Sequence, residues 1–205
     1  MLLVFAAFSV FSVQAEEIPT GPNLSQLLSP IKTMTASFTQ TLTDAEGTVL
    51  QISSGEMSIA QLNQIRWIIN RPMPQQFITD GKLVWLFDPD LEQVIIQAYE
   101  PNLAATPAGL FSGDPEAIDR AFSVVYDHSI SRLDSFVLTP KNTQELYQSL
   151  RFDFSEQQPR SLEFIDSLNQ TTRIELSDVV LNPALADNLF TFEIPDAVDV
   201  INHVD

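Results

Sequence analysis

A mainly β protein, built as an antiparallel sandwich or barrel, is predicted by three features of the 205-residue sequence. Short segments of alternating apolar and polar residues recur from Thr33 onward, turn residues separate them, and helical patterns are few and short. A sheet of this size twists and curls rather than staying flat. The expected strands, about eleven, are residues 36–42, 49–59, 65–69, 77–79, 83–87, 91–96, 122–130, 135–139, 146–154, 161–166 and 172–180.

The strongest hairpin signal is Asp80-Gly81, which joins residues 77–79 to residues 83–87. Side chains alternate along a strand, so the two aromatic residues of the second segment lie on one face, and Val84 and Leu86 lie on the other. Because both faces are apolar, we expect each to be covered, one by a core or helix and the other by a cavity or ligand. Phe190 and Phe192, spaced by two, are further candidates for inward-facing strand residues.

Short helices are expected at both ends of the chain. Leu24 and Leu28 belong to an apolar stripe with helical spacing, which should end near Ser29 because Pro30 follows. Asn182-Pro183 could open another helix.

Two short helices are expected in the middle of the chain. Thr106-Pro107 and Asp114-Pro115 each place a capping residue before a proline at the first helical position. Leu110 and Phe111 follow the first of these and lie between glycines. We interpret this stretch as an apolar lid over the sheet, with ordinary core-capping turns as the alternative.

The first fifteen residues have the pattern of a secretory signal peptide. An apolar run over residues 1–13 is followed by Val13-Gln14-Ala15, which resembles a cleavage site. The run is shorter than the ~20 residues needed to span a bilayer. We therefore expect a signal peptide at residues 1–15 and one domain at residues 16–205, which lacks cysteine and must rest on an ordinary core.

Charge and composition argue against several classes of function. Ten basic and 27 acidic residues give a net charge of −17, which repels nucleic acid and anionic lipid surfaces. His128 and His203 are far apart in the sequence, and no motif of a nucleophilic enzyme is present. We predict no catalytic residues, no metal site and no cofactor.

Aromatic residues favour a protein that binds something apolar. Fourteen phenylalanines and two tryptophans exceed what strand pairing requires, and a curled sheet that stays open leaves room for a ligand. The residues predicted to line this hydrophobic cavity are Phe38, Met57, Trp67, Phe77, Trp85, Phe87, Phe152, Phe154 and Phe164.

Several segments, in their order and spacing, resemble the LolA family of periplasmic outer-membrane lipoprotein carriers. They include residues 36–40, Gly55-Glu56-Met57, Arg66-Trp67 and residues 80–85. The resemblance implies an unclosed antiparallel β-barrel of about eleven strands covered by a lid of short helices. It also implies acylated lipoproteins as cargo, the inner-membrane LolCDE transporter as donor and the outer-membrane receptor LolB as acceptor. We expect a monomer in the periplasm.

One position departs from the family pattern. Many members carry a basic residue and a proline just before the third strand, and that arginine bonds to the lid. Gln61-Leu62 stands there in this sequence, which makes Gln61 the expected lid latch, with Arg66 or Arg71 as stand-ins. The alternative function is a periplasmic carrier of another lipid or apolar ligand on the same scaffold.

Overall fold

The computed structural model describes residues 22–99, 115–127, 129, 132–142, 147–186 and 188–204. Within them the chain forms two short helices and twelve strands. The elements are α1 (Leu24–Leu28), β1 (Thr33–Thr43), β2 (Val49–Ala60), β3 (Gln64–Arg71), β4 (Gln75–Asp80), β5 (Leu83–Asp88), β6 (Gln93–Ala98), α3 (Pro115–Ala121), β7 (Phe122–Asp127), β8 (Asp134–Pro140), β9 (Tyr147–Ser155), β10 (Gln158–Asp166), β11 (Thr171–Leu181) and β12 (Asp199–Asn202).

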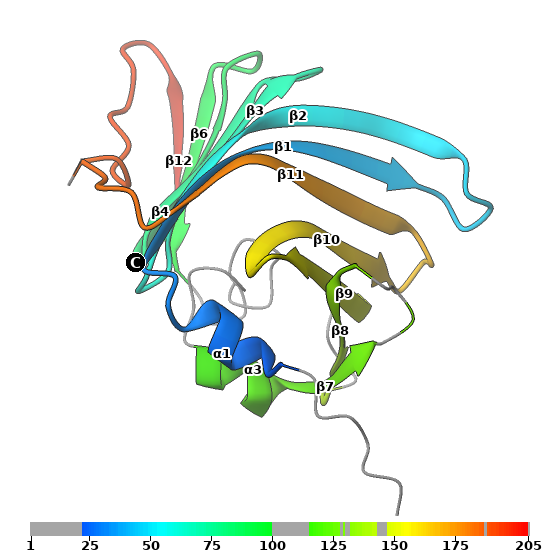
Figure 1. Cartoon of the computed structure of the whole chain (residues 1–205). Helices are drawn as coiled ribbons and strands as arrows, with labels where there is room; N and C mark the ends of the chain where they lie inside the picture. The colour runs from blue at the N-terminus through cyan, green and yellow to red at the C-terminus, as the bar shows by residue number, and fades with distance from the viewer. Residues whose placement is uncertain are drawn as a thin grey trace, which may run out of the picture.

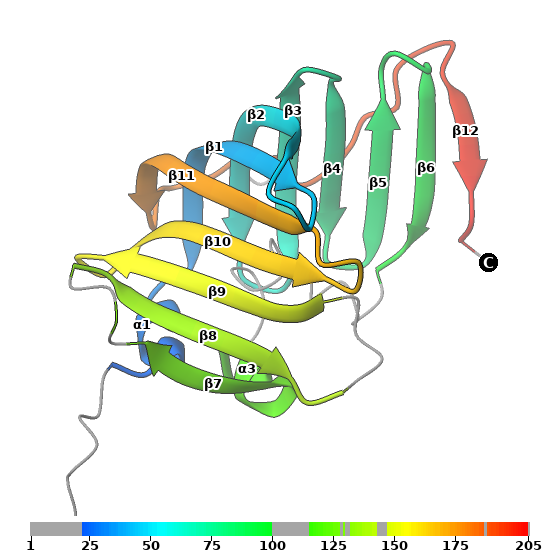
Figure 2. The same cartoon turned by 90° about the vertical axis from the view of Figure 1, so that its right-hand side faces the viewer.

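All twelve strands belong to one sheet, in the order β12-β6-β5-β4-β3-β2-β1-β11-β10-β9-β8-β7. The end strands β12 and β7 are not paired with each other, so the barrel does not close. Figures 1 and 2 show the sheet curling around α1 and α3. The predicted mainly β, unclosed antiparallel barrel is therefore confirmed, and each of the eleven expected strands is present.

The main core lies between the concave face of the sheet and the two helices. Leu24 and Leu28 of α1 and Ile118 of α3 are buried in one cluster with inward-facing residues of the sheet, among them Phe38 and Phe152. The Ser25 hydroxyl donates to an Asp119 carboxylate oxygen at 2.9 Å, which ties the two helices together. Helices this short are marginal in isolation, so packing on the sheet stabilises them.

The helix predictions have mixed outcomes. The α1 helix ends before Ser29 as expected, and α3 begins at the predicted Pro115. The helix at Asn182-Pro183 was a wrong prediction. Asn182 adopts a φ of 57°, and its side-chain oxygen accepts from the Lys32 amide at 2.7 Å, so this residue joins the end of β11 to the start of β1. Leu110, Phe111 and the N-terminal residues 1–15 lie outside the described residues.

The C-terminal segment crosses the convex face of β3–β6 before it adds β12 to the sheet (Figure 1). Phe190 is buried outside the main core cluster, and the Phe192 ring lies 5.3 Å from the Phe87 ring. Neither residue is in a strand, so the prediction that they are strand residues was wrong. The twelfth strand was not predicted, because it is only four residues long and pairs in parallel with β6.

Candidate functional site

Strands β3–β6, which we call the wing, expose a patterned inner face. Strand register places directly paired residues on the same face. The register gives three rows that cross the wing: a deep row (Ile65, Thr79, Val84, Gln97), an apolar row (Trp67, Phe77, Leu86, Ile95) and a polar row (Gln75, Asp88, Gln93), with Ile69 at the β3 end of the polar row. The deep row is closed, since Ile65, Thr79 and Val84 are fully buried.

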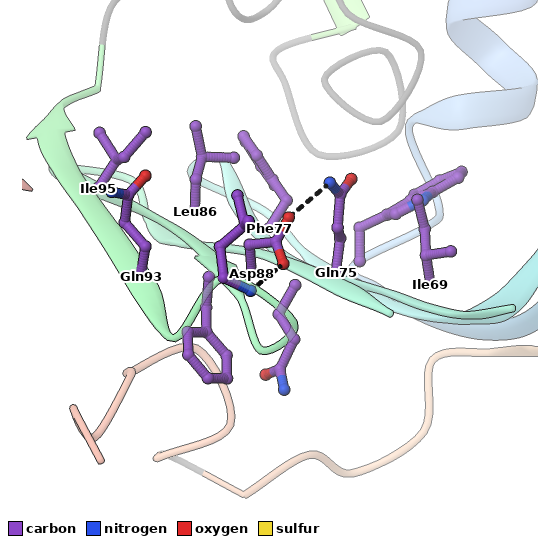
Figure 3. Close-up of a pocket in the computed structure, with 11 residues that line it drawn as sticks. Ile69, Gln75, Phe77, Leu86, Asp88, Gln93 and Ile95 are labelled. Atoms are coloured by element: carbon purple, nitrogen blue, oxygen red, sulfur yellow. Dashed lines mark hydrogen bonds between the residues drawn. The ribbon is translucent and has the colours of Figure 1, made fainter. Parts of the chain in front are cut away.

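A pocket of about 320 Å³ lies over the apolar and polar rows. Figure 3 shows Leu86 and Ile95 beside Phe77 on this face, with Gln75, Asp88 and Gln93 along one side. Leu86 is 36% exposed, an unusual state for a leucine on an inner face. The pocket therefore joins an apolar floor to a polar edge, which is the composition of a site for a ligand that has both kinds of group.

The hairpin signal at Asp80-Gly81 explains how the floor is built. Gly81 adopts a φ of 88°, and an Asp80 carboxylate oxygen accepts from the Lys82 and Leu83 amides, both at 2.8 Å. A Cβ on Gly81 would lie 2.3 Å from the Leu62 carbonyl oxygen, so the turn requires glycine there. This turn fixes the register that places Phe77 opposite Leu86.

A second glycine lets the wing meet the rest of the core. A Cβ on Gly55 would lie 1.8 Å from the Ile68 carbonyl oxygen and 3.0 Å from the Phe38 ring. Without that atom, Phe38 lies across β2 and packs its ring 4.2 Å from the Trp67 ring. The apolar row of the wing is therefore continuous with the main core.

The predicted cavity residues form two sets, one in the main core cluster and one on the convex face of the wing. Seven share the main core cluster: Phe38, Met57, Trp67, Phe77, Phe152, Phe154 and Phe164. Of these, Trp67 and Phe77 line the pocket. Phe38, Met57, Phe152 and Phe154 are at most 2% exposed, so they are packed in the core rather than around an open space. The Phe164 ring contacts Tyr147 at 4.8 Å, and burial raises the pKa of that tyrosine.

Trp85 and Phe87 lie on the convex face, opposite the apolar row. Trp85 pairs with Ile78, and Phe87 pairs with Gln76, so their register separates them from Phe77 and Leu86. Phe87 nevertheless lines the pocket, and its ring lies 5.3 Å from the Phe192 ring. Its position is therefore compatible with the predicted cavity, whereas Trp85 does not line this pocket.

The predicted latch residues are not near the pocket. Arg66 lies on the convex face, where it lines a hollow of about 390 Å³ with Phe192 and Glu193. Gln61 donates its backbone amide to the Lys32 carbonyl at 3.0 Å, and its side chain reaches the Ile31 carbonyl at 3.5 Å. The lid residues Leu110 and Phe111 lie outside the described part of the chain, so the latch at Gln61 or Arg66 stays a prediction. Gln61 contacts the connection between α1 and β1.

Sequence reasoning missed eight of the eleven residues that line the pocket: Leu86, Ile95, the polar row, Ile69, Gln76 and Leu91. A signal for the first two was present. A two-residue turn at Gly81-Lys82 pairs Phe77 with Leu86, so Leu86 belonged with Phe77 from the start. The polar residues were missed because the cavity candidates were chosen only among apolar side chains.

The described residues contain neither a metal-binding cluster nor a membrane-spanning helix. Among the residues that the structure describes, no three or more histidine, aspartate or glutamate side chains are grouped to hold a metal ion. Within the same residues, no helix has the length and hydropathy to cross a membrane. His203 is exposed, and His128 lies outside the described part of the chain.

Comparison with known proteins gives a consistent result. Residues 29–193 match the family model described as outer membrane lipoprotein carrier protein LolA. The outer-membrane lipoprotein carrier protein of Pseudomonas paraeruginosa is 39% identical over 187 residues, which cover 91% of this chain and 89% of that protein. The protein of the same name from Azotobacter vinelandii is 37% identical, with 98% of this chain and 96% of the other covered.

Solved structures show the same fold at low identity. An uncharacterised conserved protein from Thermus thermophilus superimposes with a TM-score of 0.56 at 9% identity, covering 86% of this chain and 97% of that one. At this identity the likeness concerns the fold alone. The match over residues 29–193 and the two curated relatives show the family: the chain belongs to the LolA family of outer membrane lipoprotein carrier proteins.

Proposed function

We propose that this protein binds the acyl chains of lipoproteins in the periplasm, shields them from water and delivers them to the outer membrane. The pocket over Trp67, Phe77, Leu86 and Ile95 is the observation that carries the proposal. It is apolar, open and continuous with the core. In this proposal the inner-membrane LolCDE transporter supplies the lipoprotein, and the receptor LolB accepts it.

The free energy of hydration explains the need for such a carrier. A triacylated lipoprotein carries on the order of 40 methylenes, and at about 0.8 kcal/mol each their exposure costs roughly 30 kcal/mol. Transfer through water without a carrier would be prohibitively slow. Loading therefore requires work by the donor, whereas the carrier itself needs only to bind the chains, exclude water and release them.

The pocket accommodates only part of this cargo in the state described. Its volume of about 320 Å³ is at the lower end of the range for ligand sites. Further chains need space that Phe38, Phe152 and Phe154 now fill. We propose that α1 and α3 move away from the sheet on loading, since Leu24 and Leu28 of α1 and Ile118 of α3 share the buried cluster with this aromatic core. The first chain enters at the wing, where the apolar row is already open.

Binding of a synthetic triacylated lipopeptide tests the proposal, measured by displacement of a fluorescent apolar dye. Leu86→Gln places an amide in the pocket and should weaken binding about tenfold, because burying a leucine contributes about 1.5–3 kcal/mol. Leu168→Gln is the matched control, since Leu168 is 69% exposed in the turn between β10 and β11. Equal effects of the two substitutions would contradict a site in the wing.

Release of lipoprotein from inner-membrane vesicles tests the carrier role itself. The wild-type protein and Leu168→Gln should release labelled lipoprotein into the soluble fraction, and Leu86→Gln should release much less. Mass spectrometry of the released complex identifies the cargo. A free phospholipid or glycolipid in place of a lipoprotein would support the alternative carrier and overturn the proposed cargo.

A further inference from the structure

The polar row of the pocket has a fixed geometry. The Gln75 side-chain amide donates to one Asp88 carboxylate oxygen at 3.2 Å, as Figure 3 shows. The other oxygen accepts from the backbone amides of Asp90 at 3.0 Å and Leu91 at 3.1 Å. Gln93 pairs directly with Asp88 across β5 and β6. The carboxylate is therefore held in place at the edge of the apolar floor.

Asp88 gives this edge a negative charge without a balancing cation in the pocket. Among the described residues that line the pocket, it is the only one that carries a charge. Arg71 follows Ile69 by two residues on β3, but it is exposed and does not line the pocket. The whole chain has a net charge of −17, so the electrostatic potential around it has the same sign as the Asp88 carboxylate. Apolar walls beside the carboxylate strengthen its interaction with a nearby ligand charge.

We propose that the polar row selects acyl ligands by the charge of their head, and that Asp88 is a specificity-determining residue. The Gln75 and Gln93 amides can donate to and accept from an uncharged amide, which is the group that links an acyl chain to a peptide. An anionic head, such as a phosphate or carboxylate, would lie beside Asp88 and be repelled. The row thus admits acyl amides and excludes fatty acids and anionic phospholipids. This inference rests on the proposed binding of acyl chains in the wing.

The competing explanation is that Asp88 only caps its turn. Aspartate and asparagine both accept backbone amides through a side-chain oxygen, so Asp88→Asn keeps the turn and removes the charge. Asp90→Asn is the matched control, because Asp90 is exposed in the same turn and does not line the pocket. The two variants have the same net charge, and only one of them changes the charge at the pocket.

Two acyl-matched probes separate the explanations. N-dodecanoyl glycinamide is neutral and N-dodecanoyl glycine is anionic, and the rest of each molecule is the same. Dissociation constants are measured by dye displacement for the wild type and both variants. Asp88→Asn should tighten binding of the anion about fivefold, the order expected for removing one nearby like charge, and change binding of the amide less than twofold. Asp90→Asn should change the dissociation constant of neither probe by more than about twofold.

Ionic strength provides a second readout. The wild-type preference for the amide should decrease as salt is raised, because the Debye length falls from about 30 Å at 0.01 M to about 8 Å at 0.15 M. The preference of Asp88→Asn should depend less on salt. If Asp88→Asn and the wild type bind the anion equally while both bind the amide, charge selection is overturned and the proposed function stands. If the wild type binds neither probe and no lipopeptide, the proposed function fails and the inference fails with it.

Discussion

The inner face of the wing is packed differently from the inner face of strands β7–β11, at the other end of the sheet. In β8 and β9 the inner face is full: Phe136, Phe152 and Phe154 are at most 1% exposed, with ring centroids 5.9 Å apart between Phe136 and Phe154 and 4.5 Å apart between Phe152 and Phe154. In the wing the inner face is open, and Leu86 remains 36% exposed. One continuous sheet thus has a filled half and a half that can accept a ligand.

On the convex faces the contrast is reversed: the side behind β7–β11 carries polar groups, and the side behind the wing carries a second set of buried apolar residues. Behind the filled half, Asp153 accepts from the Ser135 and Ser161 hydroxyls at 2.7 and 2.8 Å, and Arg173 pairs with Glu163 at 3.2 Å. Behind the wing, the convex face carries apolar residues beside Arg66 and Gln76, and the C-terminal segment covers it. Ile78 and Val94 are buried there although they point away from the main core. The wing therefore has a second small core on its convex face, which allows its concave face to remain unfilled.

The largest expected effect comes from the filled half. Phe152→Ala should lower the free energy of unfolding by about 3–5 kcal/mol, because a fully buried ring leaves a cavity. Phe77→Ala should lower the free energy of unfolding by less than about 2 kcal/mol, since the partly exposed Phe77 ring already borders an open pocket. Urea unfolding followed by circular dichroism measures both values. Equal losses would show that the two halves are packed alike.

A second substitution tests whether the C-terminal segment supports the wing. Phe190→Ala should lower the free energy of unfolding by about 3 kcal/mol, at the lower end of the range for buried rings because Phe190 lies outside the main core cluster. It should also weaken binding of the apolar dye, although Phe190 does not line the pocket. Unchanged dye binding in a folded variant would separate the pocket from its convex cover.

The smallest expected effect is electrostatic and belongs to the filled half. A hydrogen bond from the Ser129 side chain, its backbone amide at 2.9 Å and the Arg151 guanidinium at 2.7 Å hold the pKa of Asp127 at about 2, below the usual 3.8. Ionised Asp127 therefore contributes stability that is complete above about pH 4 and is lost as the pH falls through about 2. The melting temperature of Asp127→Asn should approach that of the wild type as the pH falls over this window. A difference that stays constant with pH would contradict the assignment.

Most of the fold could be predicted because alternation and turn residues are local signals. Residues 77–97 contain an Asp-Gly turn and clear alternation, and they form strands as expected. Phe190 and Phe192 have the same spacing, but they find no strand partner and pack as a cover instead. Spacing by two indicates that side chains share a face, and only pairing with neighbouring strands shows which face it is.

The site was predicted less well than the fold for the same reason. Trp67 and Phe77, both cavity candidates, are paired on the inner face and line the pocket. In β5 both faces are apolar, and the turn that pairs Phe77 with Leu86 was not used to choose between Trp85 and Leu86 as the inner residue. Whether an aromatic group borders a pocket or a filled core depends on what covers it, and the cover comes from segments distant in sequence.

The two tryptophans, one on each face of the wing, allow the central claim to be tested directly. Trp67 lines the pocket and Trp85 lies on the convex face. An acyl ligand with bromine along its chain quenches tryptophan fluorescence only at short range. In Trp85→Phe, which keeps Trp67, the ligand should quench the fluorescence strongly, and in Trp67→Phe, which keeps Trp85, it should quench weakly. Strong quenching of Trp85 with little effect on Trp67 would place the acyl chain on the convex face and contradict the account.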